Sequence, residues 1–206
     1  MNHVYSIGHS LHAANYFFEL LSLFEIEVLV DVRSMPRSTR APQFNADSLQ
    51  LACKKLGMQY LPMGDTLGGR TSNLSLVGAK GRVEYTRLAA TSEFQGGLRR
   101  LRVGAETYRI ALLCAEKNPI ECHRALLVGR FLSELLRPMS EVRHILANGD
   151  YITQSDIERS LLAKFGWPDS RDLFESEQKR IADVYARQGQ EVAWLVRDAN
   201  WYEESE

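Results

Sequence analysis

The sequence contains few cysteines and no long hydrophobic run. Its three cysteines, Cys53, Cys114 and Cys122, are an odd and low count, which argues against a disulfide framework and for free thiols. The first residues, Met1-Asn-His-Val-Tyr5, lack the basic and apolar regions of a signal peptide. No apolar stretch approaches the roughly 18 residues of a membrane helix. We therefore expect a cytoplasmic protein that does not associate with membranes.

The sequence also lacks an excess of charge and several familiar motifs. A formal net charge of -1 gives no overall attraction to polyanions, so any such site must be local. A phosphatase or rhodanese loop needs an arginine six residues after its cysteine, but Ile120 follows Cys114 and Val128 follows Cys122 at that spacing. There is no Walker A lysine loop, and Gly68-Gly-Arg70 is too short for a dinucleotide fingerprint. The absence of a Cys-x-x-Cys pair argues against a structural zinc site.

The chain is long enough for one sizeable core. With 206 residues and 45% hydrophobic content, it is predicted to form one domain over 1–206, with 150–200 as a C-terminal helical elaboration. Strands are predicted at His3–Ile7, Glu27–Val32, Met58–Pro62, Tyr108–Ala115 and Val142–Leu146. Helices are predicted at Ala13–Phe24, Asp47–Leu56, Val83–Ala90, Glu93–Leu101, Cys122–Leu136, Ser155–Phe165 and from Ser176 toward Trp194.

Strands that alternate with helices predict crossover connections and a mostly parallel sheet. The fold class is then α/β, a Rossmann-like three-layer arrangement with the C-terminal helices packed on the core. We expect four aromatic residues to make that packing, namely Trp167, Phe174, Tyr185 and Trp194. The segment from Gly64 to Gly81 is rich in Gly, Ser and Thr, and is either a lid or binding loop or an ordinary surface loop.

Three polar clusters follow predicted strands. They are Gly8-His-Ser10, the segment from Asp31 to Ser38, and the segment from Glu116 to Arg124. Ligands of open α/β sheets bind beyond the carboxyl ends of the strands. We therefore expect the three clusters to form one composite pocket at that edge, while the spacing does not decide where His144 points.

Cys122 is the candidate nucleophile. It begins a predicted helix beside His123 and Arg124, and a helix N-terminus and neighbouring cations lower the pKa of a thiol. The alternative is that Cys122 is a packed, inert residue. Cys114, inside an apolar strand, is expected in the core, and Cys53 is expected to be structural.

The arginines are candidates for binding an anion. The guanidinium groups of Arg33 and Arg124 match carboxylate or phosphate oxygens, but each could instead pair with Asp31 or Glu116 and brace the sheet edge. His9 or Glu116 would handle protons, unless His9 is a turn residue bonded to backbone. The remaining expected substrate-binding residues are Ser10, Asp31, Arg37, Ser38 and His123.

At these residues the chain resembles the domain-of-unknown-function 488 family. The matching pieces are Tyr5-Ser-Ile-Gly-His-Ser10, Asp31-Val-Arg-Ser-Met-Pro-Arg-Ser38 with Phe44, Leu67-Gly-Gly69, Leu113 to Arg124, Val142-Arg-His-Ile145 and the region from Gln188 to Trp194. The resemblance therefore covers nearly the whole chain. It implies a compact α/β fold with a shared polar site, and it brings no activity to transfer.

Three functions compete. The first is an enzyme acting on a small anionic or nucleotide-like substrate. The second, less favoured because the charge is balanced, is a nucleic-acid or nucleotide binding module that uses Arg33, Arg37 and Arg40 near Phe44. The third is a metal site built from Cys122, His123, His9 and a carboxylate, although adjacent residues at a helix start usually point in different directions. The sequence specifies neither a cofactor nor an oligomeric state.

Overall fold

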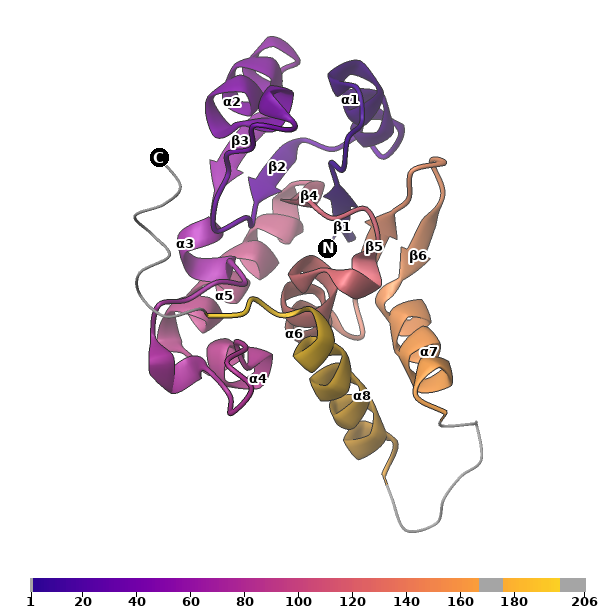
Figure 1. Cartoon of the computed structure of the whole chain (residues 1–206). Helices are drawn as coiled ribbons and strands as arrows, with labels where there is room; N and C mark the ends of the chain where they lie inside the picture. The colour runs from indigo at the N-terminus through magenta and orange to yellow at the C-terminus, as the bar shows by residue number, and fades with distance from the viewer. Residues whose placement is uncertain (1, 167–175, 197–206) are drawn as a thin grey trace.

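A six-stranded sheet forms the centre of the molecule. The computed structural model describes residues 2–166 and 176–196. The strands lie in the order β3-β2-β4-β1-β5-β6. Their bounds are β1 Val4–Gly8, β2 Val28–Asp31, β3 Gln59–Pro62, β4 Ile110–Cys114, β5 Val142–Ile145 and β6 Tyr151–Thr153. All neighbouring pairs are parallel except β5 and β6, so the predicted mostly parallel α/β fold is confirmed (Figure 1).

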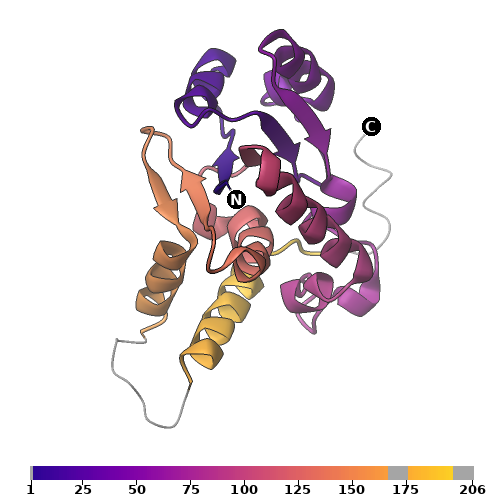
Figure 2. The same cartoon turned by 180° about the vertical axis from the view of Figure 1, so that it is seen from behind.

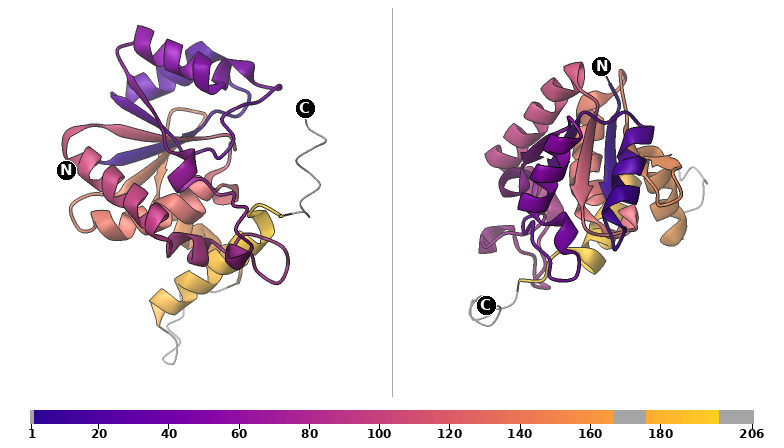
Figure 3. Two further views of the ribbon diagram at one scale, coloured as in Figure 1. Left: turned by 90° about the vertical axis from the view of Figure 1, so that its left-hand side faces the viewer. Right: turned by 90° about the horizontal axis from the view of Figure 1, so that it is seen from above.

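Helices cover both faces of the sheet, as the left view of Figure 3 shows. Along β1, Tyr5 and Ile7 pack on one side and Val4 on the other, which is the two-residue period of a strand. The face with Tyr5 and Ile7 is covered by α1 (Ala14–Leu23) and α2 (Ala46–Lys55). The face with Val4 carries a larger cluster of buried hydrophobic residues, called the second cluster below. It is covered by α3 (Gly64–Leu67), α4 (Tyr85–Ala89), α5 (Ser92–Thr107), α6 (Arg130–Leu136), α7 (Gln154–Lys164) and α8 (Glu177–Val192).

The C-terminal helices pack on this core, as predicted. α7 and α8 lie against each other and against the segment that precedes α6 (Figure 2). Tyr185 of α8 is buried, and Trp194 packs partly buried against the second cluster. Trp167 and Phe174, which were expected to join them, lie outside the described residues. No helix in the described ranges is long and apolar enough to cross a membrane.

Three local features differ from the sequence-based prediction. The presumed loop from Gly64 to Gly81 contains α3 and a short 3-10 turn at Leu74–Leu76. No strand was predicted after Val142–Leu146, but Tyr151–Thr153 forms β6, an edge strand that pairs with β5. The helix predicted over Cys122–Leu136 starts as a π-helix, Arg124–Gly129, before α6 begins. Short π-helical segments are frequent at functional sites.

Buried side chains that pack on the π-helix explain its irregular hydrogen bonding. The side-chain amide nitrogen of Gln154 donates to the Ala125 carbonyl, 3.1 Å away, so that a polar group from α7 is inserted against the backbone of the segment. Gly129 gives this group room, because a Cβ there would lie 2.4 Å from the Gln154 amide oxygen. Tertiary packing, which the local sequence does not encode, therefore sets the hydrogen-bond pattern at this helix start.

Candidate functional site

The predicted clusters lie at the carboxyl ends of three adjacent strands. Gly8 of β1 is paired with Cys114 of β4, and Asp31 of β2 with Leu113. The chain after β1 runs beside the chain after β4, because the backbone N–H of His9 donates to the Cys114 carbonyl at 2.9 Å. Gly8 permits this approach, since a Cβ there would lie 1.8 Å from the Glu116 carbonyl oxygen.

A pocket of about 140 Å³ opens at this edge. Three of the predicted residues line it, namely Arg33, Glu116 and His123. The other lining residues are Ser34, Met35, Gly69, Arg70, Tyr85, Cys114, Ala115, Glu121, Val192 and Trp194. The end of β4, the segment after β2, the segment after α3 and the residues that follow α8 therefore meet around one cavity.

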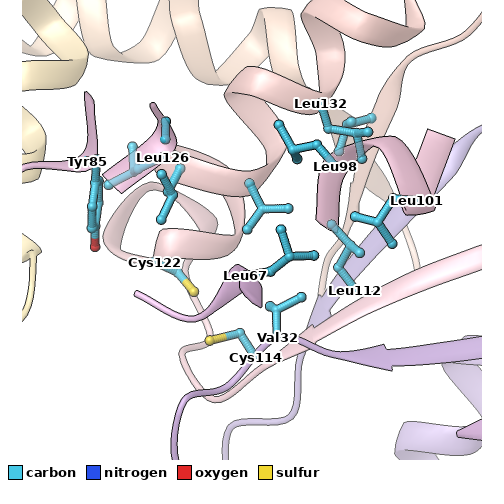
Figure 4. Packing of buried hydrophobic residues seen from close by; sticks show 14 of the residues in the cluster. Val32, Leu67, Tyr85, Leu98, Leu101, Leu112, Cys114, Cys122, Leu126 and Leu132 are labelled. Atoms are coloured by element: carbon cyan, nitrogen blue, oxygen red, sulfur yellow. The ribbon is translucent and has the colours of Figure 1, made fainter. Parts of the chain in front are cut away.

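Two thiols, a carboxylate and an imidazole converge beside this pocket. The sulfur atoms of Cys114 and Cys122 each lie 2.9 Å from the same Glu116 carboxylate oxygen. The Nδ1 atom of His123 lies 3.5 Å from the Cys114 sulfur. One donor atom from each of the four side chains lies within 4.8 Å of the other three, and Figure 4 shows the two sulfurs next to each other at the edge of the hydrophobic core. Such a group can hold a metal ion or act as a nucleophile with its base.

Backbone contacts fix the orientation of the His123 ring. Its Nε2 atom lies 2.9 Å from the Val32 carbonyl oxygen, so Nε2 carries the proton that it donates there. Nδ1 is thereby turned toward the thiols. The ring packs against the backbone of Gly69, where a Cβ would lie 2.8 Å from the ring carbon Cγ. The Leu67-Gly-Gly69 motif thus has a physical role beside the histidine.

The acidic groups of the cluster perturb one another. Burial and the neighbouring Cys122 raise the pKa of Cys114 well above its usual value, and desolvation together with Cys122 raises the pKa of Glu116. Burial opposes ionisation of Cys122, but contacts with Cys114, Arg124 and His123 outweigh it and lower its pKa. Burial likewise opposes protonation of His123, yet Cys122 raises the pKa of this imidazole. Of the two thiols, Cys122 is therefore the one whose ionisation its surroundings favour.

Arg33 is largely engaged within the protein. Its guanidinium bonds both carboxylate oxygens of Asp31, the Phe44 carbonyl and the Nε2 atom of His9. Four of its five N–H groups are accounted for in this way. Asp31 also accepts a hydrogen bond from Tyr60. The pair braces the end of β2, and one of the five N–H groups of Arg33, which lines the pocket, is not used in these four bonds.

His9 lies behind this ion pair and does not line the pocket. Nδ1 of its ring is 2.8 Å from the Ser10 carbonyl oxygen, so Nε2 is the atom that accepts from Arg33. Burial lowers the pKa of His9 to about 4. The ring stacks on Phe44 with centroids 4.6 Å apart. Of the two roles considered for His9, these contacts agree with that of a turn residue hydrogen-bonded to backbone and not with proton transfer.

Arg124 is fully buried and bonds backbone oxygens. Its Nη1 donates to the Glu116 carbonyl at 2.5 Å, and its Nη2 donates to the Lys117 carbonyl at 3.0 Å. It thereby fixes the turn that carries Glu116, and its charge lowers the pKa of Cys122. The structure places Arg124 under the site and not in its wall.

The other predicted residues lie apart from the pocket wall. Ser10 has a φ of 48° and donates its backbone N–H to Ala115. The Ser38 hydroxyl accepts from the Ala41 amide within a local turn. Arg37 is exposed. None of these three residues lines the cavity.

Sequence reasoning did not place Cys114, Arg70, Tyr85 or Trp194 in the site, although all four line the pocket. Cys114 is buried, as expected of a core residue, but its sulfur also faces the pocket. Its position two residues before Glu116 was the signal that could have placed it. Arg70, Tyr85 and Trp194 come from segments far apart in the chain, and no local spacing indicates that they meet.

A comparison with known protein families assigns the chain to one of them. Residues 13–131, more than half of the chain, match the family model described as domain of unknown function DUF488. The chain belongs to this family. The match includes Asp31, Arg33 and the segment from Cys114 to Arg124, and it begins after Ser10. No match was found among curated proteins or among solved structures.

Proposed function

We propose that this chain is an enzyme acting on a small anionic substrate, with the pocket beyond β2 and β4 as its active site. The observation that carries the proposal is the convergence of Cys114, Glu116, Cys122 and His123 at one cavity. Thiols, imidazole and carboxylate are the groups that proteins use for nucleophilic attack, proton transfer and metal-assisted reactions. A binding module has no need to collect them around one point.

The basic groups of the pocket support an anionic substrate. The guanidinium carbon of Arg70 lies 3.8 Å from the centroid of the Trp194 ring, which holds the side chain at the pocket. Arg70 makes no ion pair with any residue in the described ranges, so its donors are available. Together with the remaining N–H of Arg33, it offers the forked geometry that carboxylate and phosphate oxygens require.

The size of the cavity favours a small molecule. A volume of about 140 Å³ is below the roughly 300–1,000 Å³ of pockets that enclose drug-sized ligands. Only the reacting end of a nucleotide-like compound would enter. We therefore place the anionic group near Arg70 and the reacting atom near the Cys114 and Glu116 side chains.

The nucleic-acid alternative loses its main support. It depended on Phe44 as a stacking platform beside exposed arginines, but the Phe44 side chain is fully buried and its ring packs against His9 and Phe17. No base can stack on it.

Turnover of a defined set of compounds tests the proposal. The purified full-length protein is incubated with a panel of small phosphate esters and carboxylic acids, and products are followed by mass spectrometry. We expect turnover that Glu116→Gln and Cys114→Ser reduce at least 100-fold and that Cys53→Ala leaves unchanged, because Cys53 lies in α2 on the opposite face of the sheet. A panel left unaltered by the wild-type protein, or equal rates in all variants, would contradict the proposal.

A further inference from the structure

We infer that Cys114, Cys122 and His123, with Glu116, form a binding site for a transition-metal cation, and that their donor chemistry selects zinc. The four donor atoms lie within 4.8 Å of one another. They come from the end of β4, the turn after it and the start of the π-helix, all of which are held by the core. This inference goes beyond the proposed function and does not depend on it, because metal content is measured without a substrate.

The histidine has the orientation of a metal ligand. Histidines that bind metals commonly donate their other ring N–H to a carbonyl or carboxylate, which fixes the tautomer and aims the free nitrogen. Here Nε2 of His123 donates to the Val32 carbonyl at 2.9 Å. Nδ1 then presents its lone pair 3.5 Å from the Cys114 sulfur. The contact with Val32 is made by backbone that directly follows β2, so it holds the ring without any help from the cysteines.

The cluster consists of acidic groups that a cation would attract. Two thiol groups and a carboxylate share one small volume, and both sulfurs lie 2.9 Å from a single Glu116 oxygen. A divalent ion placed among the three groups would attract all of them at once. The buried guanidinium of Arg124 bonds carbonyl oxygens and does not contact the carboxylate of Glu116 through any hydrogen bond in the described residues.

The ligand set indicates the metal. Thiolate and imidazole donors suit zinc and disfavour magnesium and calcium, which take oxygen ligands. Two cysteines and one histidine are the three protein ligands of some catalytic zinc sites, whose fourth position stays open to water or substrate. Here Glu116 supplies the fourth donor from the wall of the pocket, so that the fourth position faces the cavity.

The burial of Cys122 favours a metal ligand over a reactive nucleophile at this position. The Cys122 sulfur points into the cluster, and the residue is 1% exposed and does not line the pocket. A nucleophile has to reach its substrate, whereas a metal ligand does not. Cys114 faces the pocket, but both thiols share one carboxylate oxygen, and a lone nucleophile requires no second thiol there.

Metal analysis of the full-length protein tests the inference. Untagged protein is produced in medium with added zinc, purified without chelator and analysed by mass spectrometry of the elements. We expect stoichiometric zinc in the wild type and in Cys53→Ala, and at least a tenfold lower content in Cys122→Ser and His123→Ala. Wild-type protein with no more zinc than Cys122→Ser would overturn the inference.

A spectroscopic measurement on the wild type does not depend on whether the variants fold. Cobalt(II) replaces zinc in the chelator-treated, reduced protein, and the absorption spectrum is recorded. Thiolate-to-cobalt charge-transfer bands and intense d–d bands of a tetrahedral ion are expected. A spectrum of aqueous cobalt alone would refute the metal site even if an enzymatic activity were found.

Discussion

The carboxylate of Asp31 holds the guanidinium of Arg33 at two points, with Nε to Oδ1 at 2.8 Å and Nη2 to Oδ2 at 2.6 Å. Their side chains are 1% and 5% exposed. This buried pair ends β2 and supports one wall of the pocket. An isolated charge in such a place is costly, because neither water nor a counter-ion replaces the lost partner.

Replacing the carboxylate should therefore destabilise the fold. We expect Asp31→Asn to lower the free energy of unfolding by about 3–5 kcal/mol, as measured by urea denaturation. The control is Glu191→Gln, which removes the exposed partner of Lys164 and should cost at most about 1 kcal/mol. Equal losses in the two variants would show that the Asp31 pair contributes no more than a surface pair.

Gly8 should not tolerate a side chain. In Gly8→Ala the new Cβ would lie 1.8 Å from the Glu116 carbonyl oxygen, so one of the two backbones must move. We expect a loss of about 3 kcal/mol of stability, the upper end of the range for overpacked cores. Gly96→Ala is the matched control, since its Cβ meets nothing nearer than 3.9 Å and alanine favours a helix. A thermal melt that ranks Gly8→Ala with Gly96→Ala would contradict this packing.

Gly69 should affect the metal site through His123. A Cβ at position 69 would lie 2.8 Å from the His123 ring and would push the imidazole away from the Val32 carbonyl. Loss of such an orienting contact typically costs 10–100-fold in metal affinity. We expect Gly69→Ala to weaken zinc binding by about that factor in competition titrations with a chelator, while Gly96→Ala keeps the wild-type affinity.

Arg70 should determine binding of simple anions. One charge-assisted hydrogen bond contributes about 1.5–3 kcal/mol, so Arg70→Ala should weaken binding of inorganic phosphate about tenfold or more. Isothermal titration calorimetry measures the affinity. Arg99→Ala removes an exposed guanidinium on α5 and should leave it unchanged. If both variants bind phosphate as the wild type does, the anion-binding role of Arg70 is wrong.

His144 should make the fold sensitive to acid. It is fully buried between the Ser6 hydroxyl, 2.7 Å from Nδ1, and the Gln154 amide oxygen, 2.8 Å from Nε2. Burial lowers its pKa from 6.5 to about 4. Above pH 6.5 the ring is neutral in both states. As the pH falls toward 4, only the unfolded chain gains this proton, so stability is lost in that window.

The size of this effect follows from the shift in pKa. Each pKa unit corresponds to 1.36 kcal/mol, so His144 should account for a loss of about 3 kcal/mol between pH 6.5 and 4. His144→Asn will be less stable at neutral pH because it leaves buried groups unpaired. Its unfolding free energy should nevertheless fall less steeply with pH than that of the wild type. Parallel pH curves would contradict the assignment.

The sequence indicated which residues gather at the site, but it did not indicate how their side chains are oriented. Glu116, Cys122 and His123 were predicted near one another because they follow one strand. The expectation that adjacent residues at a helix start diverge does not hold here. Cys122 is extended, with φ -133° and ψ 138°, whereas His123 already has helical angles. The chain therefore bends between them, and both side chains reach the same cluster.

The sequence by itself determined the alternation of buried strands and amphipathic helices, and hence the α/β fold and the edge at which polar groups collect. Periodicity and the parallel arrangement of strands are sufficient for that. Only the tertiary structure decided that Cys114 faces the site, that Arg33 and Arg124 are bonded internally, and that Arg70 and Trp194 border the pocket. Those outcomes depend on contacts between segments far apart in the chain, for which local spacing carries no signal.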